Sequence, residues 1–128
     1  MTPSDDMGAP GDSGAPAIDP AVPPSGTGCA SCDADGGWWF HLRRCAACGR
    51  IGCCDSSPGQ HASAHAAATG HDVVRSFEPG EDWFWDYARE QYVEQGPQLA
   101  APQSHPADQG VPGPSDRVPP DWRDRLNQ

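Results

Sequence analysis

Residues 45–71 read CAACGRIGCCDSSPGQHASAHAAATGH, and they hold most of the potential metal ligands of the chain. The stretch begins with a Cys-x2-Cys motif, continues with a pair of cysteines and ends with three spaced histidines. A second Cys-x2-Cys motif precedes it. In chain order, the potential ligands are Cys29, Cys32, Cys45, Cys48, Cys53, His61, His65 and His71. Because Zn²⁺ in structural sites is bound by four Cys or His side chains, this set is sufficient for two tetrahedral sites.

The spacing of the histidines predicts how these ligands divide. His61 and His65 are four residues apart, so they share one face of a helix and can point at two ions that lie side by side. In a cross-braced domain, the first Cys-x2-Cys motif pairs with ligands beyond the second. We therefore predict one site formed by Cys29, Cys32, Cys53 and His61, and another formed by Cys45, Cys48, His65 and His71. Four protein ligands close each site, which predicts two structural Zn²⁺ ions and no catalytic one.

Composition separates a folded domain, predicted at 29–95, from its flanks. Only 36% of the 128 residues are hydrophobic, and the chain contains 15 glycines and 15 prolines. Residues 1–28 and 96–128 are rich in small and polar residues, so we expect disordered tails, with either a frayed end or a short helical turn at 121–126. A core this small supplies about 3–5 kcal/mol, whereas structural zinc supplies about 10–16 kcal/mol. Folding should therefore depend on the metal.

Inside this domain the sequence predicts a small zinc-stabilised α+β fold, with a twisted antiparallel sheet, a short helix and cross-braced zinc sites. Aromatic and β-branched residues favour strands at 38–42, 50–53, 72–77 and 83–87, with a turn at 78–81. Residues 57–70 favour a helix, because Ser-Pro begins the segment, alanines fill it and Gly70 ends it.

Charge and targeting signals narrow the function classes. The net charge is −10 and the chain has no lysine, so it lacks a basic stripe that could bind nucleic-acid phosphates. The sequence shows no secretory signal and no apolar segment long enough to span a membrane. These features predict a cytoplasmic protein with reduced thiols, which favours metal ligation over the two alternatives, three disulfides or a buried thiol cluster.

Catalytic interpretations have less support. The segment His61-Ala62-Ser63-Ala64-His65 resembles the His-Glu-x-x-His motif of metalloproteases, but it lacks the glutamate that serves as general base. The remaining cysteine, Cys54, is either a small buried thiol or exchanges roles with Cys53. His41 is assigned to a strand face and His105 to the tail. No pair of nucleophile and base stands out, so we expect the protein not to be an enzyme.

The order of these residues resembles the ubiquitin-protease-type (UBP-type) zinc finger, and most of all its short bacterial members. The matching positions are Trp39 to Arg43, Cys45, Cys48, 52–57, His61, His65, 70–71 and 76–81. In the eukaryotic members this finger binds the free C-terminal Gly-Gly tail of ubiquitin in a pocket of aromatic rings. The resemblance therefore implies a module that binds a protein or peptide tail, such as that of ubiquitin or a ubiquitin-like protein.

By position, the resemblance implies five peptide-binding residues. Trp39, on the first strand, and Trp85 and Tyr87, on the last, correspond to the aromatic wall. Glu90 corresponds to a residue that accepts hydrogen bonds from the backbone of the tail, and Tyr92 corresponds to a tyrosine at the rim of the pocket. Flat rings and backbone hydrogen bonds are the means by which glycines can be recognised, because glycines offer no side chain.

One motif departs from the family. The ubiquitin-binding members carry Gly-Arg after the cysteine that corresponds to Cys53, where this chain has Cys54-Asp55. A carboxylate there repels the terminal carboxylate of a tail, by about 1–3 kcal/mol, unless Arg43, Arg44 or Arg50 reaches the site. Two hypotheses follow. Either the domain binds a ubiquitin-like tail, or it is a structural zinc domain whose aromatics form the core and which binds an unrelated protein partner.

Overall fold

The computed structural model describes residues 18–93 and 96–126. Its centre is a five-stranded antiparallel sheet with the strand order β2-β1-β3-β4-β5. The strands are β1 (Leu42–Cys45), β2 (Ile51–Cys53), β3 (Val73–Ser76), β4 (Phe84–Asp86) and β5 (Gln91–Val93). The helices are α1 (Ala30–Asp35), α2 (His61–Thr69) and α3 (Trp122–Leu126). This arrangement confirms the predicted small α+β class. No helix within the described ranges is both long and apolar enough to cross a membrane.

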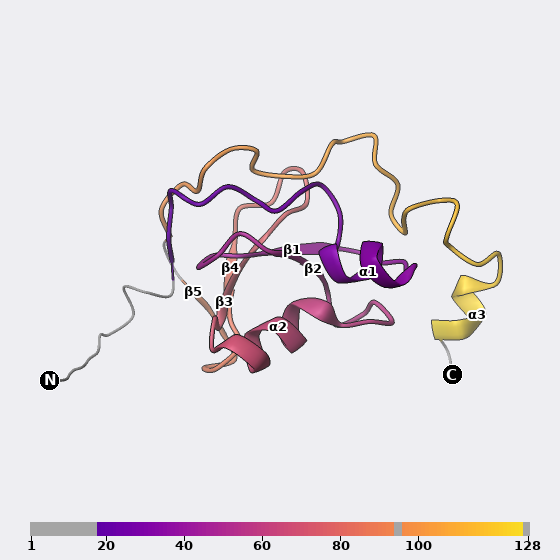
Figure 1. The fold of residues 1–128 in the computed structure, drawn as a ribbon, viewed down its shortest axis with the longest axis horizontal. Helices are drawn as coiled ribbons and strands as arrows, with labels where there is room; N and C mark the ends of the chain where they lie inside the picture. Colours follow the sequence, from indigo (N-terminus) through magenta and orange to yellow (C-terminus); the bar gives the residue numbers. More distant parts are fainter. Residues whose placement is uncertain (1–17, 94–95, 127–128) are drawn as a thin grey trace, which may run out of the picture.

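Helix α2 covers one face of the sheet (Figure 1). It ends where the sequence predicts, because Gly70 adopts the left-handed conformation at φ 79° and its N–H donates to the carbonyl of Ala66. It begins later than predicted, since Gln60 is also left-handed, at φ 49°, and keeps 57–60 in a loop. The helix lies directly on β2 at Gly52, where an added Cβ would stand 2.7 Å from the backbone nitrogen of Ala62.

Two elements are absent from the sequence-based prediction. Helix α1 begins at the first Cys-x2-Cys motif, where the Cys29 thiol accepts a hydrogen bond from the Cys32 N–H, and Gly36 ends it at φ 81°. Strand β5 follows a turn in which Glu90 adopts a positive φ of 55°. A further difference concerns the first strand, predicted at 38–42, which starts only at Leu42.

The other face of the sheet is covered by segments 18–28 and 96–106, which run together across it (Figure 1). Arg44 and Arg75 lie opposite each other on β1 and β3 and hold these segments in place. Arg44 donates to the carbonyl oxygens of Val22 and Ala100, each at 2.7 Å, and Arg75 donates to that of Gln103 at 2.8 Å. Leu99, Ala46, Val73 and Phe84 form an apolar cluster beneath.

The C-terminal segment therefore has more order than its composition indicates. Residues 96–126 contain little regular structure besides α3, which lies within the predicted helical turn at 121–126. They nevertheless make specific contacts along much of their length. His105 is buried, its Nε2 lies 2.9 Å from the Glu78 carboxylate, and its Nδ1 lies 2.8 Å from the carbonyl of Pro106. Trp122 packs edge-on against Phe40 with ring centroids 5.4 Å apart. Residues 1–17, in the N-terminal tail predicted at 1–28, lie outside the described residues.

Candidate metal centres and an aromatic hollow

The first cluster consists of Cys29, Cys32, Cys53 and His61. His61 Nδ1 lies 3.3 Å from the Sγ atoms of both Cys29 and Cys32, and 3.4 Å from that of Cys53. One ring nitrogen offers a single lone pair or a single proton, so it cannot form three hydrogen bonds. A tetrahedral ion with Zn–S bonds of about 2.3 Å and Zn–N bonds of about 2.0 Å places neighbouring ligand atoms about 3.5–3.8 Å apart. The convergence of these atoms therefore fits a central zinc ion.

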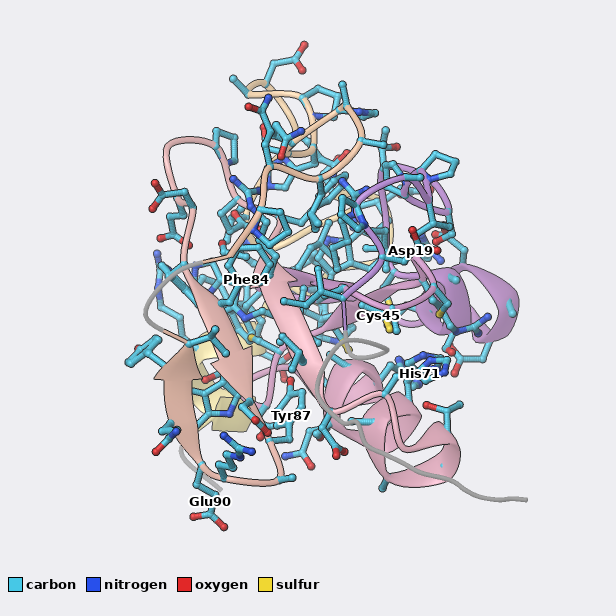
Figure 2. The ribbon with its side chains drawn as sticks, turned by 90° about the vertical axis from the view of Figure 1, so that its left-hand side faces the viewer. Asp19, Cys45, His71, Phe84, Tyr87 and Glu90 are labelled. Atoms are coloured by element: carbon cyan, nitrogen blue, oxygen red, sulfur yellow. The ribbon has the colours of Figure 1, made fainter. Side chains whose placement is uncertain are left out.

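The second cluster consists of Cys45, Cys48, His65 and His71. Cys48 Sγ lies 3.3 Å from His65 Nε2, and Cys45 Sγ lies 3.6 Å from His71 Nδ1. In each cluster the four ligand atoms lie within 4.8 Å of one another. Figure 2 shows Cys45 and His71 on the side of the sheet where α2 lies. Both clusters thus have the donor set and the size of a closed, four-ligand zinc site, and two Zn²⁺ ions fit the structure.

Short elements bring together ligands that are distant in the sequence. Cys29 and Cys32 frame the first turn of α1, and Cys53 ends β2. In the second cluster, Cys45 ends β1 and His71 follows the glycine that caps α2. Helix α2 supplies His61 to the first cluster and His65 to the second. The same helix therefore connects the two sites, as in a cross-brace.

The surroundings shift the protonation of these groups in both directions, for and against the forms that bind metal. Hydrogen bonds from the Cys32 and Cys53 thiols lower the pKa of the Cys29 thiol to about 3. Burial raises the pKa of the Cys45 thiol to about 11. Burial, together with the charges of His71 and Arg50, lowers the pKa of His65 and so favours the neutral imidazole that a metal requires. Zinc must displace protons where a thiol is still protonated, so the affinity of such a site falls as the pH falls.

A hollow of about 300 Å³ opens on the same side of the sheet as α2, because Arg43 and Val74 line both this hollow and the space beside His61 and His65. Trp83, Trp85 and Tyr87 alternate along β4 and the residues on either side of it, and all three line the hollow. Tyr92 of β5 packs edge-on against both tryptophans, with ring centroids 5.6 and 5.0 Å away. The residues that line the hollow are His41, Arg43, Cys54, Asp55, Ser56, Val74, Trp83, Trp85, Tyr87 and Tyr92.

The hollow contains charges of both signs. The Arg43 guanidinium lies over the Trp83 ring, 4.6 Å from its centroid, and pairs with no carboxylate among the described residues. Asp55 is exposed, and its carboxylate accepts a hydrogen bond from the Ser63 hydroxyl at 2.7 Å. Burial first, and then the Asp55 charge, raises the pKa of Tyr87 to about 12, so Tyr87 remains a neutral hydrogen-bond donor. The Cys54 thiol is buried at the edge of this hollow.

The structure places the five predicted peptide-binding residues in different surroundings. Trp85, Tyr87 and Tyr92 line the hollow. Trp39 does not, because both of its backbone polar groups pair with Gly113 and its ring, only 3% exposed, packs among the cysteines of the first cluster. Glu90 lies at the exposed tip of the β4–β5 turn, with its side chain pointing away from the sheet (Figure 2). Trp39 and Glu90 therefore lie outside the hollow that the other three residues line.

The structure also shows which arginine reaches the hollow and which further residues line it. Of the three arginines considered, Arg43 reaches the hollow, whereas Arg44 is buried on the opposite face and Arg50 donates to Ser31 Oγ. His41 and Trp83 also line the hollow and were not predicted. Alternation identifies both, since His41 is two residues from Arg43, and Trp83 two from Trp85.

Comparison with known proteins agrees with this geometry. The family model zf-UBP, described as a Zn-finger in ubiquitin-hydrolases and other proteins, matches residues 29–98. The chain belongs to this family. The zf-UBP domain is a zinc-binding module and not a catalytic domain. A protein from Rhodopseudomonas palustris with a solution NMR structure is 39% identical, covers 72% of this chain and 85% of its own, and superimposes with a TM-score of 0.55. No curated protein matches the chain.

Proposed function

We propose that this zf-UBP protein is an interaction module that binds the C-terminal tail of a protein or peptide in its aromatic hollow, with the Gly-rich tail of ubiquitin or a ubiquitin-like protein as the ligand class. The observation that supports the proposal most is the combination of an aromatic wall with a guanidinium in the same hollow. Trp85, Tyr87 and Tyr92 offer flat surfaces to a glycine backbone. Arg43 offers the fork of donors that binds a carboxylate.

In this proposal Arg43 also takes the place of the arginine that the ubiquitin-binding members carry where this chain has Cys54-Asp55. The Asp55 carboxylate repels an incoming terminal carboxylate, but the positive charge of Arg43 lies on the same hollow and is not neutralised by an acidic partner among the described residues. In this proposal the cation that binds the tail comes from strand β1, and not from the loop after Cys53. The two zinc ions contribute by fixing the loops and strands from which the hollow is built.

Titration of a labelled Leu-Arg-Gly-Gly peptide against the zinc-loaded protein tests this function. We expect saturable binding that Trp85→Ala abolishes, and that Arg43→Ala or amidation of the peptide terminus weakens about tenfold or more, because a charged hydrogen bond contributes about 1.5–3 kcal/mol. Arg123→Ala is the matched control, since Arg123 lies over Trp122 on α3, 4.7 Å from its ring centroid, and does not line the hollow. Absence of saturable binding below about millimolar peptide would remove the proposed ligand class.

A further inference from the structure

Residues 99–118, which we call the strap, lie beyond the part of the chain that the family model matches. The strap crosses the sheet face opposite α2 and continues past α1 (Figure 1). Along the sheet it is held by Arg44, by Arg75 and by the contact between His105 and Glu78. Its far end contacts the first Cys-x2-Cys motif, Cys29 to Cys32, which we call the first knuckle.

Arg117 makes the central contact with the first knuckle. Its Nη1 donates to the backbone carbonyl of Cys32 at 3.0 Å, and its Nη2 pairs with the Asp33 carboxylate at 2.7 Å. The guanidinium also lies over the Trp39 ring, 5.5 Å from its centroid. The Arg117 side chain thus contacts the carbonyl of the ligand Cys32, the carboxylate of Asp33 and the ring of Trp39.

A second contact strengthens the first. Trp39 and Gly113 exchange two backbone hydrogen bonds, of 2.8 and 2.9 Å. The buried ring of Trp39 belongs to the same apolar cluster as Cys29 and Cys32. Through Trp39, the strap is therefore connected to the apolar cluster that contains the ligands of the first site.

The second knuckle, Cys45 to Cys48, has different support. The carbonyls of Ala46 and Gly49 accept hydrogen bonds from the Asp19 and Ser25 N–H groups, at 2.7 and 2.8 Å. The strap approaches this knuckle through the apolar packing of Leu99 near Ala46 and through Arg44, the residue before the knuckle, which donates to the carbonyls of Ala100 and Pro102. Between residues 99–118 and the second knuckle, the described part of the chain shows no hydrogen bond or ion pair.

With zinc bound, the two sites also differ in net charge. Three thiolates and one neutral imidazole leave a bound Zn²⁺ with one net negative charge at the first cluster, whereas two thiolates and two imidazoles leave none at the second. The guanidinium of Arg117, although partly compensated by Asp33, is placed next to the site that has the excess negative charge. Groups of this kind around the ligands set their orientation and the affinity for the metal.

We propose that the strap is part of the first metal site, and that Arg117 is a positioning residue that holds the first knuckle in its ligating conformation. Metal bound at the first cluster is then retained more firmly than metal at the second. Because the coupling is reciprocal, strap docking and metal binding at the first cluster favour each other. Zinc at the second cluster exchanges independently of the strap.

Zinc release to a chromogenic chelator, measured on the full chain loaded with two Zn²⁺, tests the proposal. Two phases are expected, and His71→Ala, which removes a ligand of the second cluster, should delete the faster one. Arg117→Ala should accelerate the slower phase about tenfold or more and leave the faster phase unchanged, in keeping with the loss of a group that orients a ligand. Arg117→Lys should restore part of the retention, and Arg123→Ala should change neither phase.

Two further measurements separate a local effect from a loss of the fold. In the Co²⁺-loaded protein, the stronger thiolate charge-transfer band belongs to the site with three cysteines, and Arg117→Ala should change that band alone. Hydrogen exchange of the Gly113 N–H should remain slow in His71→Ala. Equal acceleration of both phases by Arg117→Ala, no change in either, or loss of Gly113 protection in His71→Ala would each overturn the proposal.

Discussion

The two clusters contain the same kinds of ligand, but they differ in how deeply the fold encloses them. Cys29, Cys32 and Cys53 are buried and belong to an apolar cluster with Leu42 and Phe77. In the second cluster only Cys45 is buried, whereas Cys48 is exposed and His65 and His71 are half-buried. The first cluster is therefore a part of the core, whereas the second fixes a loop and the C-terminal end of α2 at the surface.

The difference shows what each zinc ion does for a small domain. A metal in the core replaces apolar packing that 128 residues of this composition do not supply, because its ligands take the positions of core side chains. A metal at the surface restricts local chain freedom. Loss of the first ion should therefore affect the whole fold, and loss of the second should affect the segment around Cys48.

The largest expected effect comes from replacing one buried and one exposed ligand. Cys53→Ser should prevent stable folding, since structural zinc contributes about 10–16 kcal/mol and a domain has a net stability of only about 5–15 kcal/mol. Cys48→Ser should lower the melting temperature but leave a folded protein. Circular-dichroism melts, with zinc content measured by mass spectrometry, compare the two.

A related prediction concerns the number of zinc ions that Cys48→Ser retains. Cys48→Ser should retain the zinc of the first cluster alone, and its far-ultraviolet spectrum should stay close to that of the unaltered protein. If Cys48→Ser unfolds as completely as Cys53→Ser, the two clusters are equivalent and the comparison fails.

A smaller effect should reach both clusters at once, because α2 carries a ligand of each. In Gly52→Ala the new methyl group would lie 2.7 Å from the backbone nitrogen of Ala62, so α2 must move away from β2. Overpacking of this kind costs about 1–3 kcal/mol. We expect a lower urea midpoint and faster zinc release from both sites. Gly80→Ala is a useful control, since nothing lies within 4 Å of its added Cβ, although its φ of 82° adds local strain. Faster release from a single site would show that α2 does not couple the clusters.

A third change tests how far the influence of the strap extends along the sheet. His105→Leu removes the hydrogen-bonding partner of a buried Glu78 oxygen, while the other oxygen keeps its 2.8 Å bond from the Leu42 N–H. An unpaired buried acceptor costs about 1–3 kcal/mol. We expect a lower urea midpoint and increased proteolysis within 99–118, with zinc release from the second cluster unchanged. An unchanged midpoint would mean that this contact contributes nothing to strap docking.

The parts of the fold that the sequence predicts are those specified by local chemistry. The ligand sets follow from the spacing of cysteines and histidines, and Gly70 marks the end of α2 because it alone can adopt the left-handed cap there at little cost. Alternation places Trp85 and Tyr87 on one face. These features depend on residues that are close in the chain.

The features that escape prediction depend on partners far away in the sequence. The sequence assigns His105 to the tail, but the folded chain places it beside the buried carboxylate of Glu78. The resemblance assigns Trp39 to the binding site, but Trp39 pairs with Gly113 and its ring lies in the core. The composition of 96–126 indicates disorder because it contains few residues that could form a core of their own. It cannot show that Arg44 and Arg75 supply donors for the carbonyls of that segment.

The smallest effect expected reports on the loop that follows the first cluster. Tyr87 is in contact with the hollow beside this loop, and burial, followed by the charge of Asp55 and then by those of Cys54 and Cys53, raises its pKa from the ordinary 10 to about 12. Its phenol is neutral in both the folded and the unfolded protein below about pH 10. Between about pH 10 and 12 the phenol of Tyr87 ionises in the unfolded chain but not yet in the folded protein, so the folded protein loses stability as the pH rises through that window.

A titration of phenolate absorbance, with Tyr87→Phe as the reference, should show one tyrosine ionising late. Asp55→Asn should move that step toward lower pH, because it removes the larger of the charges that oppose the phenolate. If Tyr87 ionises near its ordinary value, the hollow is more open to water than its geometry implies, and the first cluster is less enclosed on this side than on the side of the strap.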